Sequence, residues 1–222
     1  MKSKNNLAFL VKFVLLLLSG IFVVEIYLLT HGAILGSALR QAIQDNKTAK
    51  VVSLLESGAD PNYVSDNASP LWHFIIEKLN MRPEAPTKGS TPLLIALRWR
   101  ENELGEDTAP PANAETIKAL VKYGANVNAA DNDGMTPLMF AAWTGNSKSL
   151  MFLLSQGAAI NAVDKYGYTS LMLACLQSQG AIVRSLLTNH AKANMKNVFG
   201  DTAFVLAERT GNLKILKMLH DN

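Results

Sequence analysis

Histidine and cysteine are the side chains most often used for metal binding and nucleophilic catalysis, and this chain of 222 residues uses both sparingly. Its histidines are His31, His73, His190 and His220, and its one cysteine is Cys175. Zinc ligands commonly come in pairs about two to five residues apart, whereas these histidines are separated by at least 30 positions. The sequence therefore predicts no metal site, and a single cysteine excludes an intramolecular disulfide.

The densest group of acidic residues offers carboxylates that could form a catalytic pair or a calcium loop. Its members are Glu101, Glu103, Glu106 and Asp107, followed by Pro110 and Pro111. A calcium loop needs alternating oxygen ligands with a central glycine and a terminal glutamate, and this segment lacks that pattern. We therefore interpret residues 101–114 as an inserted surface loop, with an active-site loop of an enzyme as the less favoured alternative. The chain contains no glycine-rich motif of the kind that binds phosphate.

The elements that would position any site are revealed by an internal repeat. Three sets of residues recur every 33 positions: Gly134, Gly167 and Gly200; Thr136, Thr169 and Thr202; and Asn128, Asn161 and Asn194. A fixed period of this length indicates a solenoid of stacked units.

Each unit reads as a turn followed by two short helices. A glycine supplies the turn, threonine can cap the first helix, and Pro137 suits its first position because no amide hydrogen is needed there. The second helix is indicated by apolar residues at helical spacing, which are Leu150, Met151, Leu153 and Leu154, and it ends at Gly157. One unit cannot bury its own apolar face, so stability must come from stacking on neighbours.

These features resemble the ankyrin repeat. Residues Asp131 to Gly145 and Leu153 to Asn161 match its turn, cap and helix-end pattern in phase. The resemblance implies an all-α, ankyrin-repeat solenoid over residues 36–222, with about five repeats. The second and third repeats are expected to be irregular, because Ser69-Pro70 and Thr91-Pro92 lie only 22 positions apart and the 101–114 loop is inserted.

Two departures from the family pattern predict local differences. The family usually has a histidine after Thr-Pro-Leu that makes structural hydrogen bonds, and this histidine is absent here. We therefore expect less rigid turns. Its positions are taken by Trp72, Leu94, Met139, Met172 and Val205. His190 stands where Gly124 and Gly157 end earlier helices, so a left-handed backbone is expected at a non-glycine residue. Cys175 occupies the place of Ala142, which predicts a packed core thiol and not a nucleophile.

The resemblance implies a non-catalytic protein-binding module that grips a protein partner with its turn tips and concave face. The matching positions are Asn132, Asp133, Met135, Trp143, Thr144, Lys165, Tyr166, Tyr168, Leu176, Gln177, Val198, Phe199, Asp201, Arg209 and Thr210. The aromatic residues among them have the composition of interaction hot spots. The alternative is that these rings only cover neighbouring turns. No cofactor is expected.

The first 31 residues form a separate segment. Residues from Leu7 to Leu29 are apolar apart from Lys12, Glu25 and two small polar positions, and 23 helical residues span about 34 Å, enough to cross a bilayer. We predict a retained transmembrane signal anchor, with its N-terminus inside and the repeats extracytoplasmic, in a periplasm if the organism is a Gram-negative bacterium. The alternative is a cleaved signal peptide and a soluble exported protein.

Net charge argues against nucleic acid as a partner. Setting aside the three lysines and one glutamate of the N-terminal segment, the 21 basic residues become 18 and the 18 acidic residues become 17. A nearly balanced domain lacks the basic footprint of a nucleic-acid-binding protein.

Overall fold

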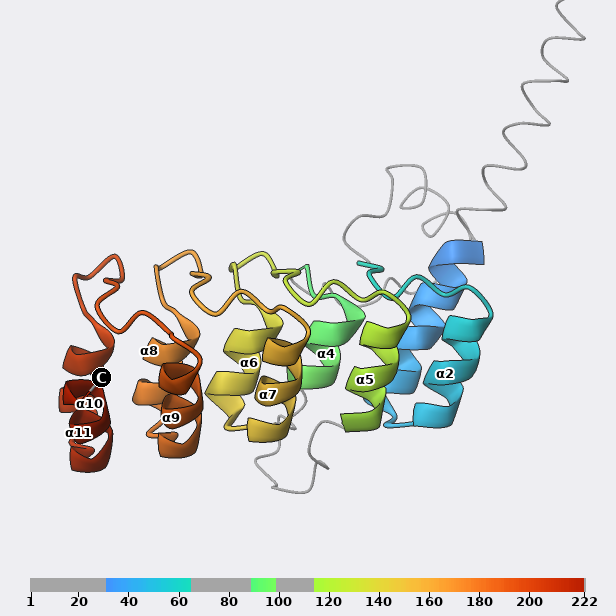
Figure 1. Ribbon diagram of the computed structural model, residues 1–222. Coiled ribbons are helices and arrows are strands. Elements are labelled where there is room, and N and C mark those ends of the chain that lie inside the picture. Colours follow the sequence, from blue (N-terminus) through green and yellow to red (C-terminus); the bar gives the residue numbers. More distant parts are fainter. Residues whose placement is uncertain (1–30, 65–88, 99–113, 222) are drawn as a thin grey trace, which may run out of the picture.

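The repeats form a row of short helices in the computed structural model, which describes residues 31–64, 89–98 and 114–221 (Figure 1). Within those ranges every regular element is a helix. The helices are 31–44, α2 (Thr48–Glu56), α4 (Pro92–Arg98), α5 (Ala114–Lys122), α6 (Pro137–Thr144), α7 (Ser147–Ser155), α8 (Ser170–Leu176), α9 (Gly180–Thr188), α10 (Ala203–Thr210) and α11 (Leu213–His220).

Helices pack both within a repeat and between repeats. Within repeats, α4 packs on α5, α6 on α7, α8 on α9 and α10 on α11. Between repeats, the first helices form one layer, from α4 through α6 and α8 to α10. The second helices form a second layer, from α2 through α5, α7 and α9 to α11. This two-layer stack confirms the predicted all-α solenoid.

Threonine caps begin the first helices. The Thr136 side chain accepts a hydrogen bond from the Met139 amide at 3.4 Å, which satisfies an amide that has no partner inside the helix. Thr169 and Thr202 repeat this contact one and two repeats later, at 3.3 and 3.4 Å. The predicted caps are therefore confirmed in the last three repeats.

Methionine compensates for the missing histidine at two of these positions. Met139 and Met172 are almost completely buried, at 0% and 1% exposed. The sulfur of Met139 also accepts the Thr136 amide at 3.5 Å. At Met139 the position thus combines apolar packing with a hydrogen bond to the sulfur.

One continuous apolar core runs along the stack between the two layers. Leu120, Leu153 and Leu186, from α5, α7 and α9, are fully buried in it. Cys175 belongs to the same core, and burial raises the pKa of its thiol to about 12. A thiol in this environment stays protonated, which confirms the prediction of a core residue.

The helix ends follow the predicted pattern. Gly124 and Gly157 have φ angles of 93° and 83°, and His190 takes the same left-handed conformation with φ 63°. A side chain in this conformation is unfavourable by about 1 kcal/mol. Backbone hydrogen bonds from the His190 amide to the Leu187 carbonyl and from the Ala191 amide to the Leu186 carbonyl, at 2.9 and 3.0 Å, hold the chain there.

The first helix begins earlier than the sequence predicted. We expected the repeats to begin at Gly36, but the helix 31–44 already includes residue 31 and Gly36 lies within it. A Cβ at Gly36 would lie 2.3 Å from Cδ1 of Tyr63, so this glycine admits an aromatic ring against the helix. The glycine therefore serves close packing and does not mark a helix start.

Three sequence predictions concern residues outside the described ranges. They are the 1–31 segment up to residue 30, the Ser69-Pro70-Leu71-Trp72 motif, and the 101–114 loop up to residue 113. In the described part, α2 packs directly against α5, so the first repeat adjoins the pair formed by α4 and α5. Across the described ranges, no helix combines the length and apolar character needed to cross a bilayer.

Candidate interaction surface at the turn tips

Turns project from one edge of the stack (Figure 1). They hold part of the predicted binding set, and the rest lies at the ends of the first helices α6, α8 and α10. Each turn is built around one side-chain oxygen. Asp131 Oδ1 accepts the amides of Asp133 and Met135, both at 2.9 Å. Asp164 and Asn197 occupy the same position in the next two turns and accept the equivalent pairs of amides at 2.8 to 3.0 Å. Each turn is therefore closed by its own side chain.

Neighbouring turns are also bonded to each other. The Lys165 amide donates to the Asp133 carbonyl at 3.0 Å, and the Val198 amide donates to the Tyr166 carbonyl at 2.9 Å. A Cβ placed at Gly134 would lie only 3.0 Å from Asp164 Cα. The turns thus form a connected row with little freedom to move independently.

A second set of bonds joins the loops at the ends of the second helices. Asn128 Nδ2 donates to the Gly157 carbonyl at 3.3 Å, and its Oδ1 accepts the Ala159 amide at 2.7 Å. Asn62 makes the same two contacts one repeat earlier, and Asn161 accepts the Lys192 amide at 2.9 Å. The sequence showed the period of these asparagines, but sequence reasoning assigned them no role.

Three of the four predicted aromatic anchors are exposed. Trp143, Tyr166 and Phe199 are 43%, 48% and 67% exposed, and Val198 beside Phe199 is exposed as well. Tyr168 is only half-buried and packs against the core. Three of the four aromatic side chains are therefore available to a partner, whereas the Tyr168 ring contributes to packing within the protein.

Two predicted polar residues form an ion pair across adjacent turns. Lys165 Nζ contacts Asp133 Oδ1, and the same ammonium lies 4.9 Å from the centre of the Tyr166 ring. The hydrogen bond to Asp133, followed by the contact with Tyr166, raises the pKa of Lys165. These contacts hold the Lys165 side chain beside the exposed aromatic ring.

Asp201 and Arg209 behave differently from the prediction of two surface contacts. Asp201 is 6% exposed, and its carboxylate accepts two hydrogen bonds from the Arg209 guanidinium at 2.7 and 2.8 Å. Asp201 therefore does not lie at the surface. It orients Arg209, which remains exposed, through a paired geometry that favours one side-chain conformation.

The other predicted residues differ in how far their side chains are exposed. Asn132, Gln177 and Thr210 are exposed, whereas Met135, Thr144 and Leu176 are half-buried. The hydroxyl of Thr144 donates to the Phe140 carbonyl at 2.8 Å. The structure thus divides the predicted set between the turns and the ends of the first helices, and its exposed aromatic side chains are Trp143, Tyr166 and Phe199.

Phe204 is an exposed aromatic residue that the sequence analysis missed. It is 39% exposed in α10, although Leu171 and Leu138, its equivalents 33 and 66 positions earlier, are each 1% exposed. Helices α6 and α8 each pack between two first helices, whereas α10 packs on α8 alone among the described first helices. The sequence did carry a signal for this exposed residue, because it has an aromatic side chain at a position where the two preceding repeats have leucine.

The described residues offer no constellation for metal chemistry. Over residues 31–64, 89–98 and 114–221, no three histidine, cysteine or acidic side chains come together in a way that could hold a metal ion.

Comparison with known proteins agrees with this architecture. The family model described as ankyrin repeats, in three copies, matches residues 37–164, 110–197 and 149–222. The human protein Rabankyrin-5 is 29% identical over 110 residues, which make up 50% of this chain and 8% of that protein. The chain thus corresponds to a small part of the length of this relative. Because the family model accounts for residues 37 to 222, the chain belongs to the ankyrin-repeat family.

Proposed function

We propose that this chain is a non-catalytic protein–protein interaction module that binds a protein partner through its turn tips and concave face. One observation carries the proposal, namely that Tyr166 and Phe199 are exposed on a row of turns whose backbones are bonded to each other, while Trp143 is exposed near the end of the first helix α6. The rings are held on a stiff framework and are framed by polar residues, as in the centres of protein interfaces.

Rigidity supports this use of the surface. Binding to a mobile surface loses affinity through the ordering of side chains and loops, and a preformed surface avoids most of that loss. The pairs Lys165–Asp133 and Arg209–Asp201 already satisfy their charges within the protein. We therefore expect the aromatic rings to supply most of the affinity, and the exposed charges to supply orientation.

We further propose that residues 1–31 anchor the module in a membrane, with the repeats extracytoplasmic. The support is the length and apolar character of Leu7 to Leu29 in the sequence. The alternative is a soluble exported protein released by cleavage of a signal peptide. N-terminal sequencing of the mature protein distinguishes them, because an anchored chain keeps its apolar segment and a cleaved one begins after it.

Removing two aromatic side chains is expected to weaken capture of the partner without unfolding the protein. We expect the double variant Trp143→Ala/Tyr166→Ala to raise the dissociation constant at least tenfold, since truncating a hot-spot side chain costs about 1 kcal/mol or more. The partner is obtained by cross-linked pull-down from membranes with the full chain, and affinity is then measured with both purified proteins.

The matched control replaces two apolar side chains that are at least as exposed but lie on the second helices. The variant Met151→Ala/Leu213→Ala should bind the partner like the wild type, because neither residue lies on a turn or on a first helix. If the aromatic variant keeps its thermal transition and still binds with unchanged affinity, the turn tips are not the binding surface.

A further inference from the structure

The outer faces of the second helices carry a row of basic residues. Lys118, Arg184 and Lys217 occupy the same repeat position in α5, α9 and α11, and Met151 takes it in α7. One turn earlier on the helix, Lys148 and Lys214 share another repeat position in α7 and α11. Helices α7, α9 and α11 contain no acidic residue, so this part of the row is purely cationic.

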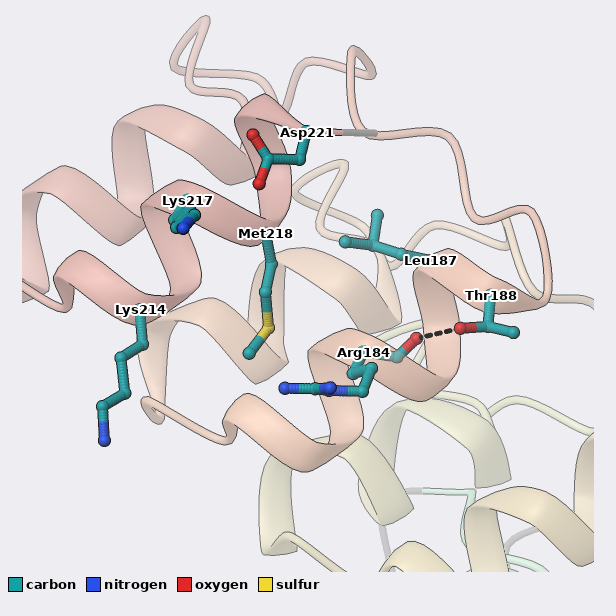
Figure 2. Close-up of a pocket in the computed structure, with 7 residues that line it drawn as sticks. All are labelled: Arg184, Leu187, Thr188, Lys214, Lys217, Met218 and Asp221. Atoms are coloured by element: carbon teal, nitrogen blue, oxygen red, sulfur yellow. Dashed lines mark hydrogen bonds between the residues drawn. The ribbon is translucent and has the colours of Figure 1, made fainter.

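Three of these cations surround a hollow of about 490 Å³ between α9 and α11 (Figure 2). Arg184 reaches from α9 toward α11, which contributes Lys214 and Lys217. The remaining lining residues are Leu187, Thr188, Met218 and Asp221. The Thr188 hydroxyl donates to the Arg184 carbonyl at 2.9 Å, so it is engaged within its own helix.

The positive charge of the hollow is not neutralised within the described part of the chain. There, Arg184, Lys214 and Lys217 have no ion-pair partner. Asp221 is the one acid at the rim, and its carboxylate lies 3.5 Å from Nδ1 of the neighbouring His220. The hollow therefore has an excess of positive charge, and its guanidinium and ammonium groups are suited to contact with a phosphate group.

Two apolar side chains protrude beside these cations. Leu213 is 78% exposed, and it shares a helix face with Lys217, four residues away. Met151 is 48% exposed and shares a face of α7 with Lys148. Protruding apolar side chains among lysines are typical of surfaces that lie on anionic membranes, where lysine stems extend toward the headgroups and apolar groups enter the interface.

The charge of this surface contrasts with that of the turn row. The turns carry Asp131, Asp133 and Asp164 together with Lys165, whereas α7, α9 and α11 contain no acidic residue. The two surfaces therefore suit different partners, and an anionic partner at the outer helices leaves the aromatic turn tips free.

We propose that the outer face of α7, α9 and α11 docks on the surface of an anionic phospholipid bilayer, with a headgroup phosphate held between Arg184, Lys214 and Lys217. Leu213 and Met151 enter the headgroup region beside it. This contact is separate from protein binding at the turn tips, and it does not depend on insertion of residues 7–29.

A fluorophore at position 213 tests this contact directly. The full chain with Leu213→Cys is labelled with an environment-sensitive dye, because Cys175 is fully buried, with its pKa raised to about 12, and stays unlabelled. Vesicles of phosphatidylcholine alone are compared with vesicles that also contain phosphatidylserine. The dye emission should shift to shorter wavelength with the anionic vesicles, should stay unshifted with the neutral ones, and should return toward the aqueous value at high salt.

Charge removal and a second label position provide the controls. Each lysine near an anionic surface raises the membrane-binding constant about fivefold. The variant Lys214→Gln/Lys217→Gln should therefore lower the binding constant for anionic vesicles roughly 30-fold. The matched variant Lys192→Gln/Lys196→Gln removes the same charge from the loop after α9 and should leave the shift unchanged. A dye at Phe199→Cys, on the turn tips, should remain in water.

Three results would overturn the proposal. The first is that the emission of the dye at position 213 does not shift with anionic vesicles, and the second is that it shifts equally with neutral vesicles. The third is that the two lysine variants lose the emission shift to the same extent while both keep the helical content of the wild type. An apolar N-terminal segment that enters both kinds of vesicle cannot imitate the expected result, because the dye reports only on its own surroundings.

Discussion

Replacing Leu153 with alanine is expected to lower the free energy of unfolding by about 2 to 5 kcal/mol, the usual range for a buried leucine. Leu153 is fully buried in α7, within the core shared by neighbouring repeats. Its removal loses apolar burial and leaves a space that the surrounding helices can only partly fill. Urea denaturation followed by circular dichroism measures the effect as a lower midpoint with an unchanged slope.

The control for Leu153 lies in the same helix. Met151→Ala removes a side chain of similar size that is 48% exposed, and its effect should be within about 0.5 kcal/mol, as for ordinary surface substitutions. If Met151→Ala destabilised the protein as much as Leu153→Ala, the assignment of the buried face of α7 would be wrong.

Gly134→Ala is expected to destabilise the protein by about 2 to 4 kcal/mol, as the sum of two effects. Gly134 has a φ angle of 81°, a left-handed conformation that an alanine side chain disfavours. In addition, the new Cβ would lie 3.0 Å from both Asp164 Cα and the Lys165 nitrogen, which belong to the backbone of the next turn. The turns would have to separate, weakening the bond from the Lys165 amide to Asp133.

Gly200→Ala isolates the second effect. Gly200 has the same φ angle of 81° at the equivalent turn position, but apart from its two chain neighbours no residue would have an atom within 4 Å of its Cβ. Gly200→Ala should therefore lower the free energy of unfolding only by the cost of the left-handed backbone conformation, about 1 to 2 kcal/mol. Equal losses for the two variants, measured by urea denaturation, would show that contact between the turns contributes nothing to stability.

Local signals in the sequence were sufficient for the elements of this fold. Threonine at Thr136, Thr169 and Thr202 marks each helix start because its side chain can bond a nearby amide whatever the tertiary structure. Glycine at Gly157 marks a helix end for an equally local reason, its freedom to take positive φ. The start of the first helix was misplaced, because Gly36 serves a contact with Tyr63 that is distant in sequence.

The candidate site was predicted less completely because exposure and pairing are not local properties. Trp143 and Phe199 were predicted as surface anchors and are exposed, but Tyr168 packs partly on the core. Asp201 looked like a surface charge, and its burial follows from the arginine eight residues later that folds back over it. The spacing of Met151 among the apolar residues of α7 suggested a core position, yet its side chain is exposed. The buried face of α7 is formed by Leu150 and Leu153.

The sequence by itself determined the repeating unit, the number of residues between units and the threonines that cap the first helices of the last three repeats, because these depend on local backbone preferences and on a period that can be read directly. The tertiary structure alone decided which side chains are free for a partner and which are engaged in joining one repeat to the next. It also brought Arg184 together with Lys214 and Lys217, about one repeat away in the chain. Such contacts depend on the pitch of the stack, which arises only when the apolar faces of neighbouring helix pairs are buried against each other.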